Sequence, residues 1–211
     1  MTLALNFVLI SEGSSDTALL PHLEQLCVLH GADDVSGAPY EDYHFPKIGK
    51  TTEARVGKLL EYQPNVDLIF IHRDSDSRDG ESRYTEVRRS MSGFKTPYVS
   101  VVPIQETEAW ALLDEKMIRQ VAQNPRGKVP LNLPLPSKIE TLASPKEHLK
   151  EVLVQASELS GRKLEKFKAQ FAQQRRRLLE NLDSQGPVRQ LKAWQRLNDD
   201  VQTVIGNLKA D

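Results

Sequence analysis

The chain has 211 residues, of which 39% are hydrophobic and 27% are charged. This length suits one α/β domain with a smaller appended part, and no run approaches the roughly 20 consecutive apolar residues that a membrane-spanning helix needs. The net charge of -1 hides an asymmetry, because residues 1–145 carry 15 basic and 20 acidic side chains and residues 146–211 carry 13 and 9. These values exclude a membrane-embedded protein. The basic part could contact nucleic acid, an acidic partner or only solvent.

The first predicted strand, residues 6–10, is followed by a polar segment with two acidic side chains. Glu12 stands at the strand's carboxyl end and is not a favoured helix cap. Asp16 stands near a predicted helix N-terminus, where a carboxylate is favoured in any case, so a capping role is the alternative to a functional one. The apolar start lacks a basic leader and a cleavage site, so we expect no signal peptide. Residues 17–30 have helical spacing, and their single cysteine, Cys27, indicates a reducing cytoplasm.

The next part of the chain gives weaker signals. A second strand is expected at residues 40–45, between glycine and proline positions. The segment 49–52, Gly-Lys-Thr-Thr, is similar in composition to a phosphate-binding loop, but that pattern needs a glycine where His44 stands and a strand directly before it. We therefore exclude such a loop. Thr51 or Thr52 is expected instead to cap a helix over residues 53–62.

The central predicted strand begins at Val66 and is a buried apolar run that ends in Asp74 and Asp76. Ligands of parallel α/β sheets bind beyond the carboxyl ends of strands, where loops carry polar groups. Two carboxylates separated by one residue can supply hard oxygen ligands to Mg²⁺ or Mn²⁺, although aspartates also cap turns. A calcium-binding EF loop from Asp74 is excluded, because Gly80 is its seventh position rather than its sixth.

Acidic side chains recur after a further predicted strand. Residues 81–92 are expected to form an exposed helix or ordered loop, and residues 98–102 a buried strand that Glu106, Glu108 and Asp114 follow. Acids in a first helical turn have a structural explanation when taken singly. Together with the acids at the two earlier strand ends, however, they would crowd carboxylates along one sheet edge. Since like charges repel unless a cation neutralises them, this recurrence favours a divalent metal.

The order of these motifs resembles a known family. A strand followed by Glu12-Gly13, a helix with Asp16 at its start, and a strand followed by Asp74-Ser75-Asp76 are similar to the TOPRIM fold of topoisomerases, primases and the nuclease part of OLD-type proteins. The segments 106–114 and 145–150 resemble a defence-associated TOPRIM-like group that is often found beside an ATPase. The resemblance covers residues 3 to about 155.

The resemblance implies a nuclease that uses Mg²⁺ or Mn²⁺ to hydrolyse DNA or RNA, in bacterial or phage-related defence and with an ABC-type or AAA ATPase partner. The implied catalytic residues are Glu12, Asp74 and Asp76, with Glu12 as a further ligand or as the base that activates water. The implied metal ligands are Glu12, Asp16, Asp74, Asp76, Glu106, Glu108 and Asp114. One alternative is a non-catalytic TOPRIM-like binding or regulatory subunit. Another is a small-molecule phosphatase with Asp74 as the nucleophile.

The C-terminal part is predicted to be helical. Residues 124–136 contain four prolines and indicate a linker, and helical patterns follow at 146–157, 164–182 and 188–208. The last two are expected to pair as a hairpin. We therefore predict an α/β fold with a TOPRIM-like parallel sheet flanked by helices and a C-terminal α-helical hairpin, divided into residues 1–123, 124–160 and 161–211.

The same hairpin is expected to dock on the catalytic domain, on a second copy of itself or on a partner protein, and a homodimer is the first choice. Its stripes contain Phe167, Phe171 and Trp194, which form more large apolar surface than two helices can bury. The basic side chains on the hairpin, among them residues 175–177, face either solvent or nucleic acid. We expect the protein to reside in the cytoplasm and not to associate with a membrane.

Overall fold

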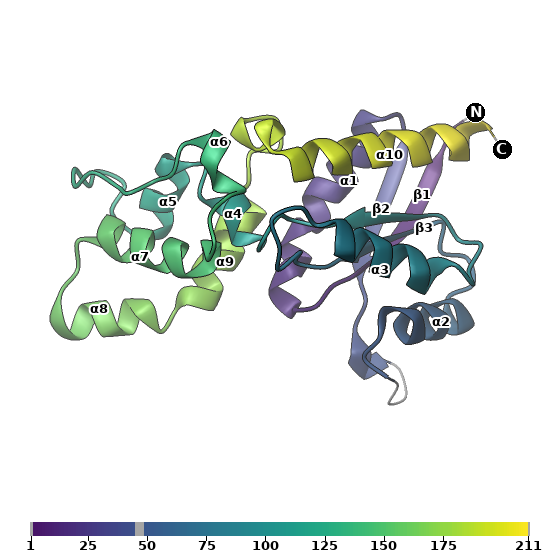
Figure 1. Ribbon diagram of the computed structural model, residues 1–211, viewed down its shortest axis with the longest axis horizontal. Coiled ribbons are helices and arrows are strands. Elements are labelled where there is room, and N and C mark those ends of the chain that lie inside the picture. The colour runs from purple at the N-terminus through teal and green to yellow at the C-terminus, as the bar shows by residue number, and fades with distance from the viewer. Residues whose placement is uncertain (1, 45–48, 211) are drawn as a thin grey trace. The chain divides into compact units, whose positions relative to one another are not determined.

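A computed structural model describes residues 2–44 and 49–210 (Figure 1). Its strands are β1 (Ala4–Ile10), β2 (Asp34–Pro39), β3 (Leu68–His72) and β4 (Tyr98–Val101). Its α-helices are α1 (Leu20–Leu29), α2 (Thr52–Tyr62), α3 (Glu81–Met91), α4 (Glu108–Ala111), α5 (Glu115–Val121), α6 (Pro136–Ile139), α7 (Pro145–Ser157), α8 (Gly161–Lys168), α9 (Phe171–Glu180) and α10 (Lys192–Ala210). Short 3₁₀ helices are η1 (Ser14–Leu19), η2 (Asp42–His44) and η3 (Pro187–Gln190). No helix within the described ranges has the length and apolar character needed to cross a membrane.

The chain forms two compact units. The sheet unit comprises residues 1–73, 81–102 and 195–211, and the helical unit comprises residues 74–80 and 103–194. The boundaries predicted at residues 123 and 160 do not coincide with this division. The predicted hairpin of residues 161–211 is itself divided, because most of α10 belongs to the sheet unit whereas α8 and α9 belong to the helical unit.

The four strands form one parallel sheet in the order β2-β1-β3-β4, which confirms the predicted α/β class. Strand β1 lies between β2 and β3, so the chain first winds to one side of β1 and then crosses to the other. The point where the strand order reverses therefore lies between β1 and β3. In open parallel sheets, ligands bind in the crevice beyond the strand ends at such a point.

Helices pack on both faces of the sheet. On one face, α2 and α3 close a core formed by Val8, Ile10, Val56, Leu59, Ile69, Ile71, Val87 and Met91. On the other face, Phe7 and Phe70 pack edge to face with centroids 4.9 Å apart. Figure 1 shows α1 and α10 on this side, where His30 Nε2 and Asn198 Oδ1 lie 3.0 Å apart. Burying each large apolar side chain contributes about 2 kcal/mol, so these two layers hold the strand ends in place.

Edge strand β2 explains an error of the sequence prediction. The second strand runs over residues 34–39 and not over 40–45. Of the predicted range, residues 40–44 contain η2, and Phe45 lies outside the described residues. Alternate residues of β2 are only partly buried, so no apolar run marks this strand. Glycine is required at position 37, because a Cβ atom there would lie 2.3 Å from Phe7 Cζ and would overlap the ring.

Most other predicted elements are confirmed. The strands expected at 6–10 and 98–102 correspond to β1 and β4. The segment 81–92, expected as an exposed helix or ordered loop, is helix α3, whose Val87 and Met91 are buried. The predicted cap of α2 is Thr51, whose hydroxyl accepts a hydrogen bond of 3.2 Å from the backbone N–H of Ala54. The single helix expected over residues 164–182 is wrong, because the chain breaks between α8 and α9. The break is stabilised by Gln174 Nε2, which donates to the backbone carbonyl of Phe167 at 2.9 Å.

The helical unit has its own core. Helices α7 and α9 pack against α4 and α5, and Trp110 meets Trp194 edge to face at 5.1 Å between centroids. Phe167 and Trp194, two of the side chains from which the homodimer is predicted, are buried in the structure. Their burial accounts for much of the apolar stripe, and the homodimer remains a prediction.

Candidate active site

A pocket of about 200 Å³ lies at the carboxyl ends of β1 and β3. Its apolar lining residues are Ile10, the last residue of β1, and Ile71, the last apolar residue of β3. Polar side chains from three segments line the rest: Ser11, Glu12, Lys50, Thr52, Arg55, His72 and Arg73. A second pocket, of about 230 Å³, shares Ser11, Glu12 and Arg55 with the first. The predicted residue Glu12 therefore stands at both pockets, at the point where the strand order reverses.

Glu12 is paired with an arginine. Arg73 Nε lies 2.5 Å from Glu12 Oε1, and Arg73 Nη1 lies 3.0 Å from Glu86 Oε1 and 3.4 Å from the Thr52 hydroxyl. The Arg73 side chain is 20% exposed and that of Glu12 is 41% exposed. One guanidinium thus links the loop after β1 to the start of α2 and to α3, and Glu12 keeps partial access to solvent.

Arg55 supplies a second cation from α2. Its Nη1 donates to the backbone carbonyl of Ser11 at 3.0 Å, and its Nη2 lies 2.9 Å from Asp42 Oδ2. Its guanidinium also lies over the ring of Tyr40, 5.8 Å from the centroid. Burial and the nearby Asp42 raise the pKa of Tyr40, and Arg55 lowers it by a smaller amount. The Tyr40 hydroxyl therefore stays protonated at neutral pH and can act as a donor.

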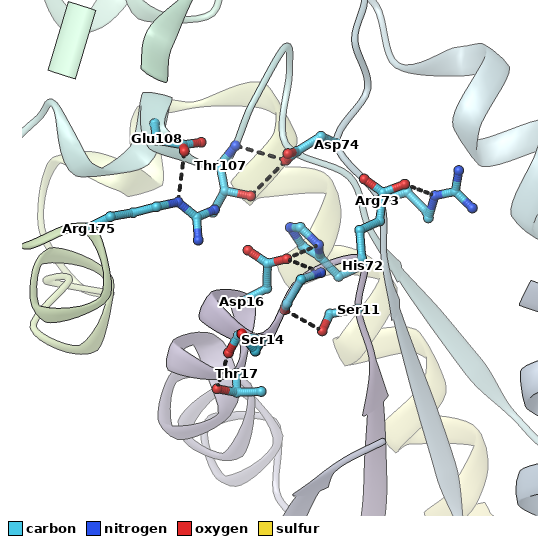
Figure 2. Close-up of polar contacts among 12 residues, drawn as sticks. Ser11, Ser14, Asp16, Thr17, His72, Arg73, Asp74, Thr107, Glu108 and Arg175 are labelled. Atoms are coloured by element: carbon cyan, nitrogen blue, oxygen red, sulfur yellow. Dashed lines mark hydrogen bonds and ion pairs between the residues drawn. The ribbon is translucent and has the colours of Figure 1, made fainter. Parts of the chain in front are cut away.

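Asp16 has the contacts of a turn cap. Its Oδ2 accepts a hydrogen bond of 3.1 Å from the backbone N–H of Gly13 and lies 3.5 Å from His72 Nδ1 (Figure 2). The side chains of Asp16 and His72 are 6% and 0% exposed. The capping alternative raised for Asp16 is therefore present, and a role as metal ligand stays a prediction.

The predicted pair Asp74 and Asp76 begins the helical unit. Asp74 Oδ1 accepts hydrogen bonds from the Thr107 backbone N–H at 2.9 Å and from its hydroxyl at 2.8 Å, as Figure 2 shows. Asp76 and Gln105 both have left-handed backbone angles, with φ of 50° and 62°, and Asp76 N donates to Gln105 O at 3.1 Å. Such conformations cost about 1 kcal/mol or more each and are often found at functional sites. The segment that carries the two aspartates is therefore tightly fixed and strained.

The three remaining predicted ligands have structural contacts. Glu108 Oε1 pairs with Arg175 Nε at 2.8 Å, and both side chains are buried. Glu106 Oε2 accepts from the backbone N–H of Lys146 in the first turn of α7, and Asp114 Oδ1 accepts from Met117 N and caps α5, each at 2.9 Å. These contacts explain the presence of the three acids without a second metal.

The fit of a metal differs among the predicted ligands. Over residues 2–44 and 49–210, no group of three or more His, Cys, Asp or Glu side chains is placed to hold a metal ion. Glu108 does not fit, because Arg175 already neutralises it in a buried setting. The carboxylate oxygens of Glu12, Asp74 and Asp76 do have the chemistry that Mg²⁺ and Mn²⁺ prefer. Of the seven predicted ligands, Glu12 and Asp16 belong to the sheet unit and the other five to the helical unit.

The sequence prediction missed the cationic lining of the pocket. Lys50 and Thr52 belong to the segment excluded as a phosphate-binding loop, yet both line the pocket. Helical spacing could have indicated Arg55. It lies three residues after Thr52 and four before Leu59, and both of these positions of α2 are buried. That spacing places Arg55 beside the sheet-facing side of α2.

No relative supplies an independent interpretation of these residues. The TOPRIM resemblance depends on Glu12-Gly13, Asp16 and residues 74–76, together with the order of the elements around them. Comparison of the chain with protein-family models, with curated proteins and with solved structures found no match.

Proposed function

We propose that the protein is a Mg²⁺- or Mn²⁺-dependent nuclease that hydrolyses phosphodiester bonds in DNA or RNA. One observation carries this proposal: the pocket at the reversal of strand order combines the carboxylate of Glu12 with the cations Lys50, Arg55 and Arg73. Cationic donors bind phosphate oxygens, and a carboxylate beside them can accept a proton from water. Asp74, which follows Arg73 in the chain, begins the Asp-x-Asp segment that the resemblance links to metal.

The chemistry assigned to these residues is a hydrolysis. Water attacks phosphorus, Glu12 accepts the proton that this water loses, and the bond from phosphorus to the leaving oxygen breaks as that oxygen takes up a proton from solvent. Arg55 and Arg73 compensate the charge on the non-bridging oxygens. Asp74 and Asp76 would hold the divalent ion, with Glu12 as a further ligand if it does not act as the base. The ion would supply further charge neutralisation and lower the pKa of bound water.

A non-catalytic binding or regulatory subunit is the second candidate. It is favoured by the ion pair that occupies Glu12 and by the lack of a three-ligand metal group among the residues described. Such a subunit would keep the cationic pocket for binding and would need no base. The small-molecule phosphatase has less support, because Asp74 Oδ1 is engaged by two donors of Thr107.

Cleavage assays separate these candidates. The purified protein is incubated with plasmid, single-stranded DNA and RNA in Mg²⁺, in Mn²⁺ and in EDTA, with and without an ATPase encoded beside it. The nuclease proposal predicts metal-dependent cleavage of at least one substrate. Binding without cleavage under every condition favours the subunit, and a trapped phospho-aspartyl adduct on Asp74 would indicate the phosphatase.

The cellular setting is proposed with the activity. We propose a cytoplasmic protein that acts in bacterial or phage-related defence with an ATPase partner and as a homodimer. Cys27, which is buried and forms no disulfide within the described residues, supports the compartment. Light scattering over a range of concentrations tests the homodimer, and co-purification tests the ATPase.

A further inference from the structure

The pocket at β1 and β3 holds more positive than negative groups. Lys50, Arg55 and Arg73 line it together with one acid, Glu12. Lys50 forms no ion pair with any residue in the described ranges. The first turn of α2 adds the partial positive charge of a helix N-terminus at the same wall, where Thr52 is the first helical residue. Asp42 and Glu86, which do not line this pocket, pair with Arg55 and Arg73. Lys50 and the helix N-terminus are therefore the positive groups that no acid of the described residues neutralises, and they favour an anion.

The two arginines also keep hydrogen-bond donors beyond their present contacts. Arg55 Nε is buried and has no hydrogen-bond partner among the described residues. The contacts of Arg73 to described residues use Nε and Nη1 and leave out Nη2. Since a guanidinium has five N–H donors in a planar fork, each arginine has a donor left for a further oxygen acceptor.

The ion pair between Arg73 and Glu12 is suited to an exchange in which another anion replaces Glu12 as the partner of Arg73. Its atoms lie 2.5 Å apart, yet Arg73 Nε lacks hydrogen-bond geometry to any described partner. Glu12 is partly exposed, so water can solvate its carboxylate once the pair opens. A phosphate with two non-bridging oxygens offers the bidentate geometry that this contact does not provide.

We propose that this pocket is a phosphate-binding subsite for the nucleic-acid backbone, held by Arg73, Arg55 and Lys50, and that the bound phosphate replaces Glu12 as the partner of Arg73. The inference rests on the proposed nuclease function. The resting ion pair keeps Glu12 neutralised, and substrate binding releases it as a base. The catalytic carboxylate therefore becomes available only when a phosphate backbone is in place.

Binding measured without metal tests this subsite apart from catalysis. Fluorescence anisotropy of a short labelled single-stranded DNA is recorded in EDTA at low salt, with inorganic phosphate as competitor. The Arg73→Gln and Lys50→Gln variants should each weaken binding by about fivefold to tenfold, as expected for the loss of one charged contact. The matched control is Arg89→Gln, which removes a charge from the exposed side of α3 and lines neither pocket.

Glu12→Gln gives the most specific result, because exchange predicts a gain rather than a loss. Removing the competing carboxylate should tighten binding by about threefold or more, with the gain reduced at high salt. Lys50 is exposed, so its variant keeps the test valid if Arg73→Gln lowers thermal stability. An affinity of Arg73→Gln and Lys50→Gln equal to that of the control would overturn the subsite. An unchanged affinity of Glu12→Gln would overturn the exchange. The expected binding pattern without any cleavage in Mg²⁺ or Mn²⁺ would leave the subsite supported and reject the nuclease.

Discussion

At the scale of single residues, Glu108 and Arg175 show how a predicted metal ligand can have a structural role. Their side chains are 3% and 8% exposed and form a charge-assisted hydrogen bond of 2.8 Å. Removing one partner of such a pair leaves an uncompensated buried charge, which costs about 3 to 5 kcal/mol. We therefore expect Glu108→Gln to lower the free energy of unfolding in urea by about 3 kcal/mol.

The double variant Glu108→Gln, Arg175→Met serves as the control for this prediction. It removes both charges and should recover most of the lost stability, because no charge remains buried without a partner. A metal ligand would behave differently, since its removal relieves repulsion in the metal-free protein. A Glu108→Gln variant that is as stable as wild type but loses metal-dependent activity would contradict the structural role.

Asp200 on α10 gives a prediction about pH. Burial raises its pKa above the usual 3.8, Arg196 lowers it and Asp199 raises it. Because the folded-state pKa is the higher one, the stability contribution is fully present below pH 3.8 and is lost as pH rises through the folded-state pKa. Asp200→Asn should therefore raise the melting temperature at pH 7 and leave it unchanged near pH 3. A melting temperature that falls at pH 7 would show that the charge of Asp200 is stabilising.

At the scale of elements, the strained segment around Asp76 and Gln105 gives a prediction about the energetic cost of its backbone conformation. Gln105 has φ of 62°, a conformation that glycine adopts without the penalty of a Cβ atom. Gln105→Gly should raise the free energy of unfolding by about 0.5 to 1 kcal/mol in urea denaturation, and Gln123→Gly, at φ of 60°, is the matched position. A destabilised Gln105→Gly with a stabilised Gln123→Gly would mean that the Gln105 side chain makes contacts worth more than the strain.

Local pattern determined which elements could be predicted from sequence. Strand β3, residues 7–10 of β1 and residues 99–101 of β4 are buried on both faces and largely apolar, so their residue types identify these strands. Strand β2 is an edge strand with Gly37 at a close contact to Phe7, and its identity depends on a neighbour far away in the chain. The break between α8 and α9 likewise depends on the side chain of Gln174, which periodicity alone does not reveal.

The same distinction applies to the site. Glu12, Asp74 and Asp76 could be selected as candidates because acids that follow apolar strands are visible in the sequence. Lys50 and Arg55 were missed because their relevance depends on tertiary placement beside Glu12. The contacts that tie Glu108 and Asp114 to structural roles are also tertiary or capping contacts, which composition cannot distinguish from metal ligation.

At the scale of the whole molecule, the candidate site residues are divided between two units. The sheet unit contains Glu12 with the cationic pocket, and the helical unit begins with Asp74 and Asp76. The division was not visible in the sequence, because residues 74–80 and 195–211 each group with parts of the chain that are distant in order. The proline-rich stretch of residues 124–136, expected as an ordered linker, lies inside the helical unit.

The most direct test of the nuclease proposal is the single-turnover cleavage rate of one nucleic-acid substrate in Mg²⁺, measured for wild type, Glu12→Gln and Glu61→Gln. Glu61 is an exposed acid at the far end of α2, paired only with Lys58 among described residues, and serves as the control. The proposal predicts cleavage by wild type and by Glu61→Gln, its loss in EDTA, and a rate for Glu12→Gln that is lower by about 100-fold or more, the usual contribution of a general base. Cleavage that continues in EDTA, or a Glu12→Gln variant as fast as wild type, would contradict it.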